Sequence, residues 1–464
     1  MSAIRVNRRR FMAAVAGAAV AAGQARGEQT PRKPPNVVFA FSDEHRWQSM
    51  PFTETPGLHA PQMARLANEG VTFTSCVSNY PVCSPYRAIL MTGRWPYETG
   101  MIDNNLPLDS NQVTLGKVFR DAGYKTGYVG KWHLGGVRAE PFGFDHSLIW
   151  TGTNNHYKSK YHLRDSKPVD TKGYNATLMT DQALEFISQN RRQPFLLMLS
   201  WNPPHSNFLD APPEKRAMYP EGSLGWRENV PEEIRTGEIK GKAIWDQSKS
   251  DHMRGYHAHI SAIDDEIGRV LTHLKELGLD DNTIFVYTSD HGTMMGSHGL
   301  GSKRQPYEES IRVPLFIRWP EKLKPSKRGG LIGAIDLMPT LCGLAGLDVP
   351  AQCHGRNLSA VVTGEAPETD TAQFIMHISK NNASGGQKHP APIFRGVRTR
   401  RYTYAVKEQG PWVLFDNEKD PYQFDNRIDD SDLAGLREQM HVMLQQMLKE
   451  ARDPFPLTPS PPAA

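Results

Sequence analysis

The strongest constraint on the fold of this chain is a series of short apolar runs, each of which leads directly into polar residues. Runs of this length and composition are typical of parallel strands that are buried on both faces. Open sheets of such strands bind ligands at their carboxyl ends, so we expect the polar residues to converge in one crevice. The runs are residues 36–43, 125–129, 195–201 and 283–289, and the polar residues at their ends are Asp43, Lys131, His205, Asp290 and His291.

Helical patterns separate these apolar runs. Residues 114–122 and 256–277 have helical periodicity and are followed by Gly123 and Gly278, a common way to end a helix. Residues 176–189 form a further amphipathic pattern. Because strands alternate with helices, we predict an α/β fold with a large, mostly parallel sheet and helices on both of its faces.

The last quarter of the chain has a different pattern. Residues 393–404 and 412–415 are expected to form strands of a small antiparallel sheet, and residues 433–452 an amphipathic helix. The Pro-rich end is expected to be flexible. The predicted units are an N-terminal signal (1–25), a main α/β domain (36–375), a C-terminal α+β subdomain (376–453) and a flexible tail (454–464).

The N-terminal segment indicates export. Three adjacent arginines at positions 8–10 and Phe11 precede a short, Ala-rich apolar run at 12–22, which is too short to span a bilayer. This pattern resembles a twin-arginine signal, with an ordinary secretory signal as the alternative, so we expect a periplasmic or secreted protein. The formal net charge of +4 comes from the four arginines of residues 1–25. The nearly neutral remainder gives no electrostatic basis for binding nucleic acid, and no later segment is apolar enough for a membrane helix.

One motif stands out for its chemistry. The stretch 83–93 reads Cys-Ser-Pro-Tyr-Arg-Ala-Ile-Leu-Met-Thr-Gly and contains the pattern C-x-P-x-R. It resembles the signature of type I sulfatases, in which a maturation enzyme oxidises the cysteine to Cα-formylglycine. The stretch 123–133, Gly-Tyr-Lys-Thr-Gly-Tyr-Val-Gly-Lys-Trp-His, resembles the family's second motif. Tyr86 is a departure, because the family usually has a small residue there. The resemblance extends over residues 36–426 and implies the fold of alkaline phosphatases, with residues 36–375 as the catalytic domain.

The resemblance also implies roles for individual residues. Cys83, as formylglycine, is the nucleophile. Arg87 holds the hydrated aldehyde and balances charge near the metal. Lys131 and His133 flank the aldehyde hydroxyls, and His133 is the expected base for sulfate elimination.

The sulfate group itself has two expected ligands. His205 and Lys303 are expected to bind it, and one of the two to protonate the leaving oxygen. Pro85, near a predicted helix start, places Cys83 at a helix N-terminus, where backbone amides favour anions. A thiolate would form a thiosulfate ester with no easy exit, whereas a hydrated aldehyde has a second hydroxyl that can expel sulfate.

The family uses one divalent cation, usually calcium, held by carboxylates from the ends of two strands. The candidates here are Asp43, Glu44, Asp290 and His291. Glu44 is a departure from the family's usual Asp or Gln, so it either coordinates the ion or hydrogen-bonds a ligand. Oxygen ligands favour Ca²⁺ or Mg²⁺, while the histidine leaves Mn²⁺ open.

The expected activity is hydrolysis of sulfate esters on sulfated carbohydrates or aryl sulfates. A phosphonate monoester or phosphodiester hydrolase of the same superfamily and a non-catalytic sulfoglycan-binding protein are the alternatives.

Cys342 and Cys353 are either buried thiols or a disulfide pair. His257 and His259 are two residues apart on a predicted helix and therefore cannot form a metal pair. Residues 264–266, Asp-Asp-Glu, are expected on the solvated face of that helix.

Overall fold

The computed structural model describes residues 33–55, 57–151, 154–163, 167–236, 249–368, 371–379 and 391–458. Residues 35–464 form one compact unit. The predicted signal at 1–25 lies outside the described residues. No helix within the described ranges has the length and hydropathy that crossing a bilayer requires.

A large mixed sheet forms the centre of the molecule, with the order β10-β2-β9-β8-β1-β7-β3-β4-β5-β6 and β11 paired with β2. Strands β8, β1, β7, β3 and β4 are mutually parallel, while β9, β5 and β6 run antiparallel to their neighbours. The strands are β1 Asn36–Asp43, β2 Val71–Val77, β3 Lys125–Lys131, β4 His146–Thr151, β5 Lys160–Leu163, β6 Val169–Asp170, β7 Phe195–Pro204, β8 Thr283–Ser289, β9 Arg312–Arg318, β10 Ser326–Arg328 and β11 Ile332–Gly333. This confirms the predicted α/β class.

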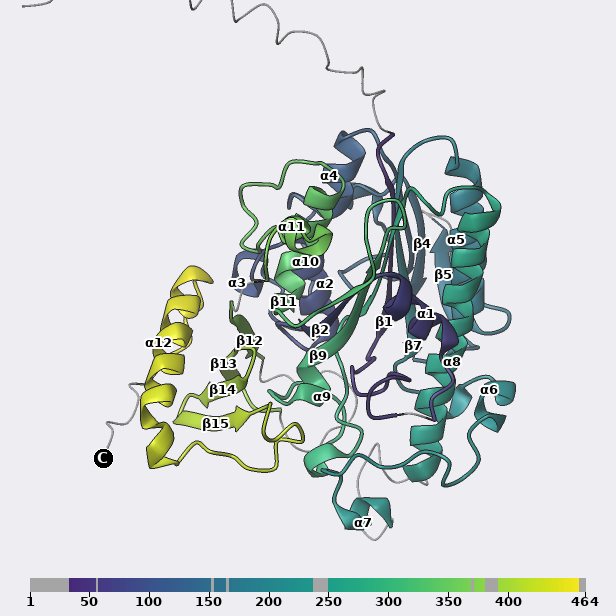
Figure 1. Cartoon of the computed structure of the whole chain (residues 1–464). Helices are drawn as coiled ribbons and strands as arrows, with labels where there is room; N and C mark the ends of the chain where they lie inside the picture. The colour runs from purple at the N-terminus through teal and green to yellow at the C-terminus, as the bar shows by residue number, and fades with distance from the viewer. Residues whose placement is uncertain are drawn as a thin grey trace, which may run out of the picture. The chain divides into compact units, whose positions relative to one another are not determined.

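Helices cover both faces of this sheet, as Figure 1 shows, with α5 and α8 on one side and α2, α4 and α10 on the other. The reason lies in the strands, whose side chains alternate between the two faces. Val37 and Phe39 of β1 belong to the core under α2, whereas Val38 and Ala40 belong to the core under α5 and α8. The helices of this domain are α1 Pro61–Glu69, α2 Cys83–Thr92, α3 Pro96–Thr99, α4 Leu115–Asp121, α5 Asn175–Asn190, α6 Pro213–Ala217, α7 Glu232–Arg235, α8 Lys249–Glu276, α9 Glu308–Ile311, α10 Ala334–Leu344 and α11 Ser359–Thr363, with short 3₁₀ turns at Glu140–Phe142, Phe208–Asp210 and Ser297–Gly299.

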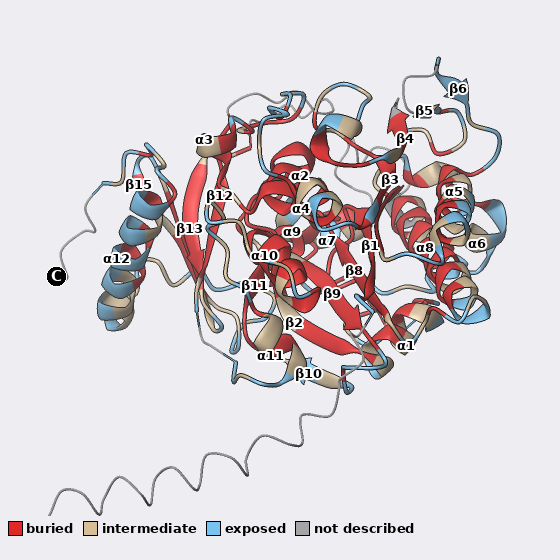
Figure 2. Cartoon of the chain, turned by 90° about the horizontal axis from the view of Figure 1, so that it is seen from above, coloured by how far each residue is buried: buried red, intermediate tan, exposed pale blue. Residues whose placement is uncertain are grey.

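A second, four-stranded antiparallel sheet follows in the C-terminal part, in the order β12-β13-β14-β15. Its strands are β12 Gln373–His377, β13 Phe394–Arg398, β14 Tyr402–Lys407 and β15 Gly410–Asp416, and α12 Ala434–Glu450 follows a 3₁₀ turn at Ser431–Leu433. The outer face of α12 is exposed and its inner face packs on the sheet (Figure 2). The small antiparallel sheet and helix are as predicted, but the expected strand at 393–404 is two strands, and β12 was not expected.

The two sheets are joined by buried polar contacts as well as by apolar packing. The Arg398 guanidinium donates to both oxygens of the Glu308 carboxylate, at 2.7 and 3.0 Å. The Asn79 amide donates to the Phe374 carbonyl at 2.8 Å. The C-terminal sheet is therefore fixed against the segments that precede α2 and β9.

Candidate active site

The centre of the site is a pair of buried carboxylates at the ends of two adjacent strands. Asp43 ends β1 and Asp290 follows β8, and the two strands pair in parallel with Ser42 opposite Ser289. Both carboxylates are 0% exposed. The Arg87 side chain lies between them, and its Nη2 donates to Asp43 Oδ2 at 3.3 Å and to Asp290 Oδ2 at 3.0 Å. The buried guanidinium of Arg87 thus links the ends of β1 and β8.

Arg87 is held from its other side by oxygen acceptors. Its Nη1 donates to the Lys131 carbonyl at 2.6 Å and to Ser200 Oγ at 2.7 Å. Burial opposes the charge of the guanidinium, but Asp290 and Asp43 outweigh it and raise the pKa of Arg87 above its ordinary value. Arg87 is therefore a permanent, oriented positive charge.

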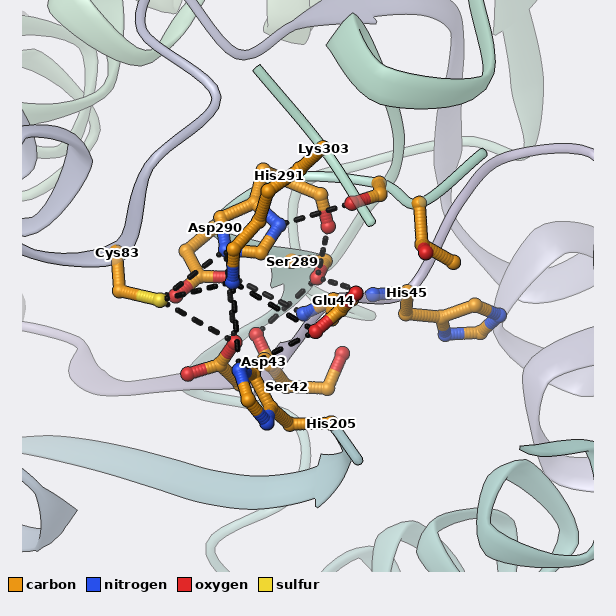
Figure 3. Close-up of polar contacts among 12 residues, drawn as sticks. Ser42, Asp43, Glu44, His45, Cys83, His205, Ser289, Asp290, His291 and Lys303 are labelled. Carbon is orange, nitrogen blue, oxygen red and sulfur yellow. Dashed lines mark hydrogen bonds and ion pairs between the residues drawn. The ribbon is translucent and has the colours of Figure 1, made fainter. Parts of the chain in front are cut away.

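Cys83 is the first residue of α2, as the position of Pro85 predicted. Figure 3 shows its sulfur facing the carboxylates and Lys303. Sγ lies 3.2 Å from Lys303 Nζ, 3.2 Å from His291 Nε2 and 3.6 Å from Asp43 Oδ1. The site thus places a reactive atom at a helix N-terminus, where the backbone favours negative charge.

The surroundings of Cys83 favour its ionised form. Burial alone would raise the pKa of the thiol, but the cations Lys303 and Lys131 outweigh it and hold the pKa well below the usual range. His291 and a hydrogen bond from His133 act in the same direction. Any anionic oxygen that replaced the sulfur at this position would be stabilised by the same groups.

A second group of polar residues surrounds this centre. The Lys131 ammonium donates to Asp43 Oδ2 at 2.5 Å. Lys303 Nζ lies 3.3 Å from His205 Nε2, and Glu44 Oε2 lies 3.2 Å from His205 Nε2 and 3.6 Å from Lys303 Nζ. All ten residues that the sequence singled out therefore meet in one place, at the carboxyl ends of β1, β3, β7 and β8.

The donor set fits a divalent cation. Ligand atoms of Asp43, Asp290, His291 and Cys83 lie within 4.8 Å of one another. Lys131, His205 and Lys303 overcome burial and the neighbouring thiolate and lower the pKa of Asp43. Burial and Asp43 raise the pKa of Asp290, which is the cost of two carboxylates facing each other. A divalent cation bound by both carboxylates, in addition to Arg87, would further reduce their repulsion.

Glu44 has a different environment from the other predicted ligands. Its backbone N–H donates to Asp290 Oδ1 at 3.1 Å, while its carboxylate contacts His205 and Lys303. Its carboxylate also lies within reach of Asp43 in a group that includes His205 rather than Asp290. Direct coordination by Glu44 stays a prediction, and the contacts favour the alternative of hydrogen bonding to its neighbours.

Some supporting residues were not found from the sequence. Ser200 Oγ accepts from Arg87, and Asn104 Oδ1 accepts from the Ser84 N–H at the start of α2, at 3.0 Å. Ser78 Oγ donates to the Asp290 carbonyl at 2.7 Å. Ser200 is in β7, while Ser78 and Asn104 are in loops, and single serines and asparagines carry no sequence pattern that would distinguish them.

The expected solvated face at 264–266 is wrong for two of its three residues. Asp264 is buried and accepts from the backbone N–H groups of Gln62 and Met63 at the start of α1, at 2.9 and 2.7 Å. Glu266 is also buried and accepts from Thr177 Oγ1 at 2.7 Å. Helix α8 packs against α1 and α5, so Asp264 and Glu266 accept hydrogen bonds from those helices and do not face solvent.

Comparisons with known proteins agree with this geometry. The family model named Sulfatase matches residues 35–347, and a model described as N-sulphoglucosamine sulphohydrolase, C-terminal, matches residues 296–450. An ulvan-active sulfatase of Formosa agariphila is 33% identical, over 91% of this chain and 82% of the relative. An N-acetylglucosamine-6-O-sulfatase of Bacteroides thetaiotaomicron is 29% identical, over 92% and 88%. A protein solved with its substrate D-glucosamine-2-N,6-O-disulfate has a TM-score of 0.82 and 27% identity, over 91% of this chain and 99% of that one.

An alkaline phosphatase-like sheet with a buried carboxylate pair and a possible metal-binding cluster at its carboxyl edge is typical of metal-dependent ester hydrolases. Within that class the chain belongs to the sulfatase family and is a sulfuric ester hydrolase.

Proposed function

We propose that the enzyme removes sulfate from sulfated carbohydrates, using a formylglycine formed from Cys83 and a divalent metal at Asp43 and Asp290. The observation that carries this proposal is the position of Cys83 Sγ, which lies at a helix N-terminus and 3.2 Å from the Lys303 ammonium. In the proposed mature enzyme this sulfur marks the place of the hydroxyl oxygens of a hydrated aldehyde. When present, that group supplies one hydroxyl to attack sulfur and a second to expel sulfate.

The surrounding side chains would position the ester. Lys303 Nζ and His205 Nε2 lie 3.3 Å apart, so one sulfate oxygen that faces both atoms could accept from two nitrogen donors. Glu44 Oε2 lies 3.2 Å from His205 Nε2 and 3.6 Å from Lys303 Nζ, so this carboxylate would orient both side chains toward the ester. Arg87 and Lys131 would offset negative charge close to the nucleophile.

His133 is the proposed base for elimination of sulfate. Burial lowers the pKa of its imidazole, so the ring is neutral near pH 7 and able to accept a proton. A hydrogen bond between His133 and Cys83 supports this role. Its Nδ1 has no hydrogen-bond partner among the described residues.

Asp43, Asp290 and His291 would hold the metal, with Glu44 as the remaining candidate. Carboxylate oxygens favour Ca²⁺, with Mg²⁺ and Mn²⁺ as alternatives. A bound cation would lower the charge repulsion between the carboxylates and polarise the sulfate oxygens.

The proposed substrate class rests on the relatives, whose printed names include ulvan and N-acetylglucosamine 6-O-sulfate activities. Export to the periplasm or beyond, by the twin-arginine route, is proposed from residues 1–25 and suits a polymeric glycan substrate. A formylglycine-generating enzyme is the proposed maturation partner.

Mass spectrometry of the Cys83 peptide tests the nucleophile. The protein would be produced with a maturation enzyme, and the peptide treated with an aldehyde-specific tag, since the hydrate and the thiol have nearly equal mass. We expect a lighter, taggable peptide. An unmodified thiol in protein that hydrolyses sulfate esters would refute the formylglycine.

A substrate comparison tests the activity. One preparation would be assayed on sulfated mono- and oligosaccharides, on an aryl sulfate, and on the matching phosphate and phosphonate esters. We expect kcat/KM to be highest for a sulfate ester. A preference for the phosphonate ester, or glycan binding without turnover by fully matured protein, would contradict the proposal.

A further inference from the structure

A second cluster of potential metal ligands lies outside the catalytic centre. It consists of His156, Asp210 and His259, which come from the segment before β5, the 3₁₀ turn after β7, and helix α8. Asp210 Oδ1 lies 3.8 Å from His156 Nε2 and 3.6 Å from His259 Nε2. Both imidazoles are 0% exposed, and their ring centroids are 4.4 Å apart.

The outer nitrogen of each imidazole has its own polar partner. His259 Nδ1 lies 2.7 Å from the Tyr174 hydroxyl, and His156 Nδ1 lies 3.4 Å from the Asn202 side-chain amide. Metal-bound histidines have this arrangement, because a partner on the outer nitrogen fixes the ring and directs the other nitrogen at the ion. Here both Nε2 atoms lie within 3.8 Å of Asp210 Oδ1.

Two buried oxygens in and beside the cluster accept no hydrogen bond from any described residue. Asp210 Oδ2 accepts from the His156 backbone N–H at 2.9 Å, but Oδ1 is buried and accepts from no described residue. Asn202 Oδ1 is likewise buried and unpaired within the described ranges. Such groups are costly and need an explanation.

A purely hydrogen-bonded network explains only part of these contacts. In it, His156 Nε2 would donate to the His205 carbonyl at 2.9 Å and His259 Nε2 to the Asn207 carbonyl at 3.1 Å. Asp210 Oδ1 and Asn202 Oδ1 would stay unpaired. With a cation bound by both Nε2 atoms and Asp210 Oδ1, the Nδ1–H of His156 is free to donate to Asn202 Oδ1 after a turn of that amide.

We propose that His156, Asp210 and His259 bind a divalent transition-metal ion, with Zn²⁺ as the best match. Two imidazole nitrogens and one carboxylate oxygen are a common zinc ligand set, and they disfavour Ca²⁺, which prefers oxygen ligands throughout. The His205 and Asn207 carbonyls adjoin the same nitrogens and can complete the coordination. Asp210 also lines a surface hollow of about 470 Å³, so the cluster lies close to the solvent-accessible surface.

This ion would support the sulfate-binding residue. The segment from His205 to Asp210 would be tied through the metal to α8 and to the segment before β5. His205 would thereby be held in place from behind while its ring faces the substrate. The role is positioning, because the cluster meets His205 through its backbone carbonyl, which lies 2.9 Å from His156 Nε2.

Cobalt titration tests the proposal without relying on activity. Metal-free full-length protein would first receive excess Ca²⁺ to fill the catalytic centre, and then Co²⁺, whose visible absorption reports nitrogen and oxygen ligands. We expect one tightly bound equivalent that Zn²⁺ displaces. Absence of a visible spectrum in folded wild-type protein, or a spectrum that excess Ca²⁺ removes, would overturn the proposal.

Variants assign the ion to the cluster. Asp210→Asn keeps the acceptor for the His156 N–H and should lower Co²⁺ affinity at least about 10-fold. His257→Gln, a buried histidine on α8 that contacts Ser49 instead, is the matched control and should bind Co²⁺ as wild type does. Asp290→Ala should lose Ca²⁺ but keep the Co²⁺ spectrum. Equal affinity in Asp210→Asn and wild type, or loss of the spectrum in Asp290→Ala, would place the ion elsewhere.

Discussion

Replacing Arg87 with methionine should destabilise the metal-free enzyme strongly. The guanidinium is 1% exposed and lies between two carboxylates that are 0% exposed, so its removal leaves two buried charges with less compensation. Breaking a buried pair of this kind costs about 3–5 kcal/mol. Methionine preserves most of the side-chain volume, so the loss reports the charge more than the packing.

The cost can be expressed as a melting temperature. Unfolding entropy is about 2.1 cal/mol/K per residue, which is about 0.9 kcal/mol/K for a unit of about 430 residues. A loss of about 3–5 kcal/mol therefore lowers Tm by about 3–6 °C. Calcium should raise the Tm of Arg87→Met by more than it raises the Tm of wild type. The reason is that the variant lacks the repulsion between the guanidinium and the bound ion.

Thermal unfolding of both proteins at one scan rate, with chelator and with Ca²⁺, measures these shifts. Arg94→Met is the matched control, because Arg94 follows the same helix but pairs with Glu98 at 3.5 Å at 23% exposure, a kind of pair worth about 0–1 kcal/mol. If Arg87→Met melts within a degree or so of Arg94→Met in chelator, the reasoning about buried charge is wrong.

Other substitutions probe the remaining chemistry. Cys83→Ser should reduce turnover by about 10³-fold or more and leave a sulfated enzyme that intact-mass analysis detects; normal turnover would exclude the elimination route. Burial lowers the pKa of His257 to about 3 from an ordinary value of 6.5. Between these pH values the unfolded chain binds a proton at this residue and the folded protein does not, so the free energy of unfolding falls as the pH drops from about 6.5 to 3. His257→Gln should flatten this limb by up to about 1.4 kcal/mol per pH unit in urea unfolding, and parallel curves would contradict it. Changing Arg8 and Arg9 to lysine should retain the protein in the cytoplasm on fractionation; unchanged export would indicate an ordinary secretory signal.

The sequence predicted the central strands well because polar residues mark the two ends of each apolar run. The apolar runs at 36–43 and 283–289 begin and end at polar residues, and they coincide with β1 and β8. β9 was not expected, since Pro314 lies within it and proline argues against an internal strand. Residues 399–401, Thr-Arg-Arg, turn the chain between β13 and β14 without a glycine or proline, so the two strands appeared as one.

The site was predicted as a set of residues but not as a set of contacts. Motif matches placed all ten residues, and the sheet explains why they meet. The partners that hold Arg87 could not be found, because Ser200 lies on β7, far in the sequence from α2, and a side-chain hydrogen bond between distant elements leaves no periodic signal. The same reason hid the pairing of His259 with His156, which depends on how α8 crosses the end of β7.

The burial of Cys83 limits the time during translation in which this residue is accessible to another protein. Every residue of α2 is buried, and the hydrophobic core around this helix includes Val286 of β8 and Val313 of β9. Ribosomes add about 5–20 residues per second, so the roughly 235 residues between Cys83 and the end of β9 take about 12–50 s to emerge. During that interval Cys83 belongs to an unfolded chain, which the proposed maturation enzyme could bind. In the folded protein Cys83 is 2% exposed, so the proposed oxidation would have to precede the completion of the sheet.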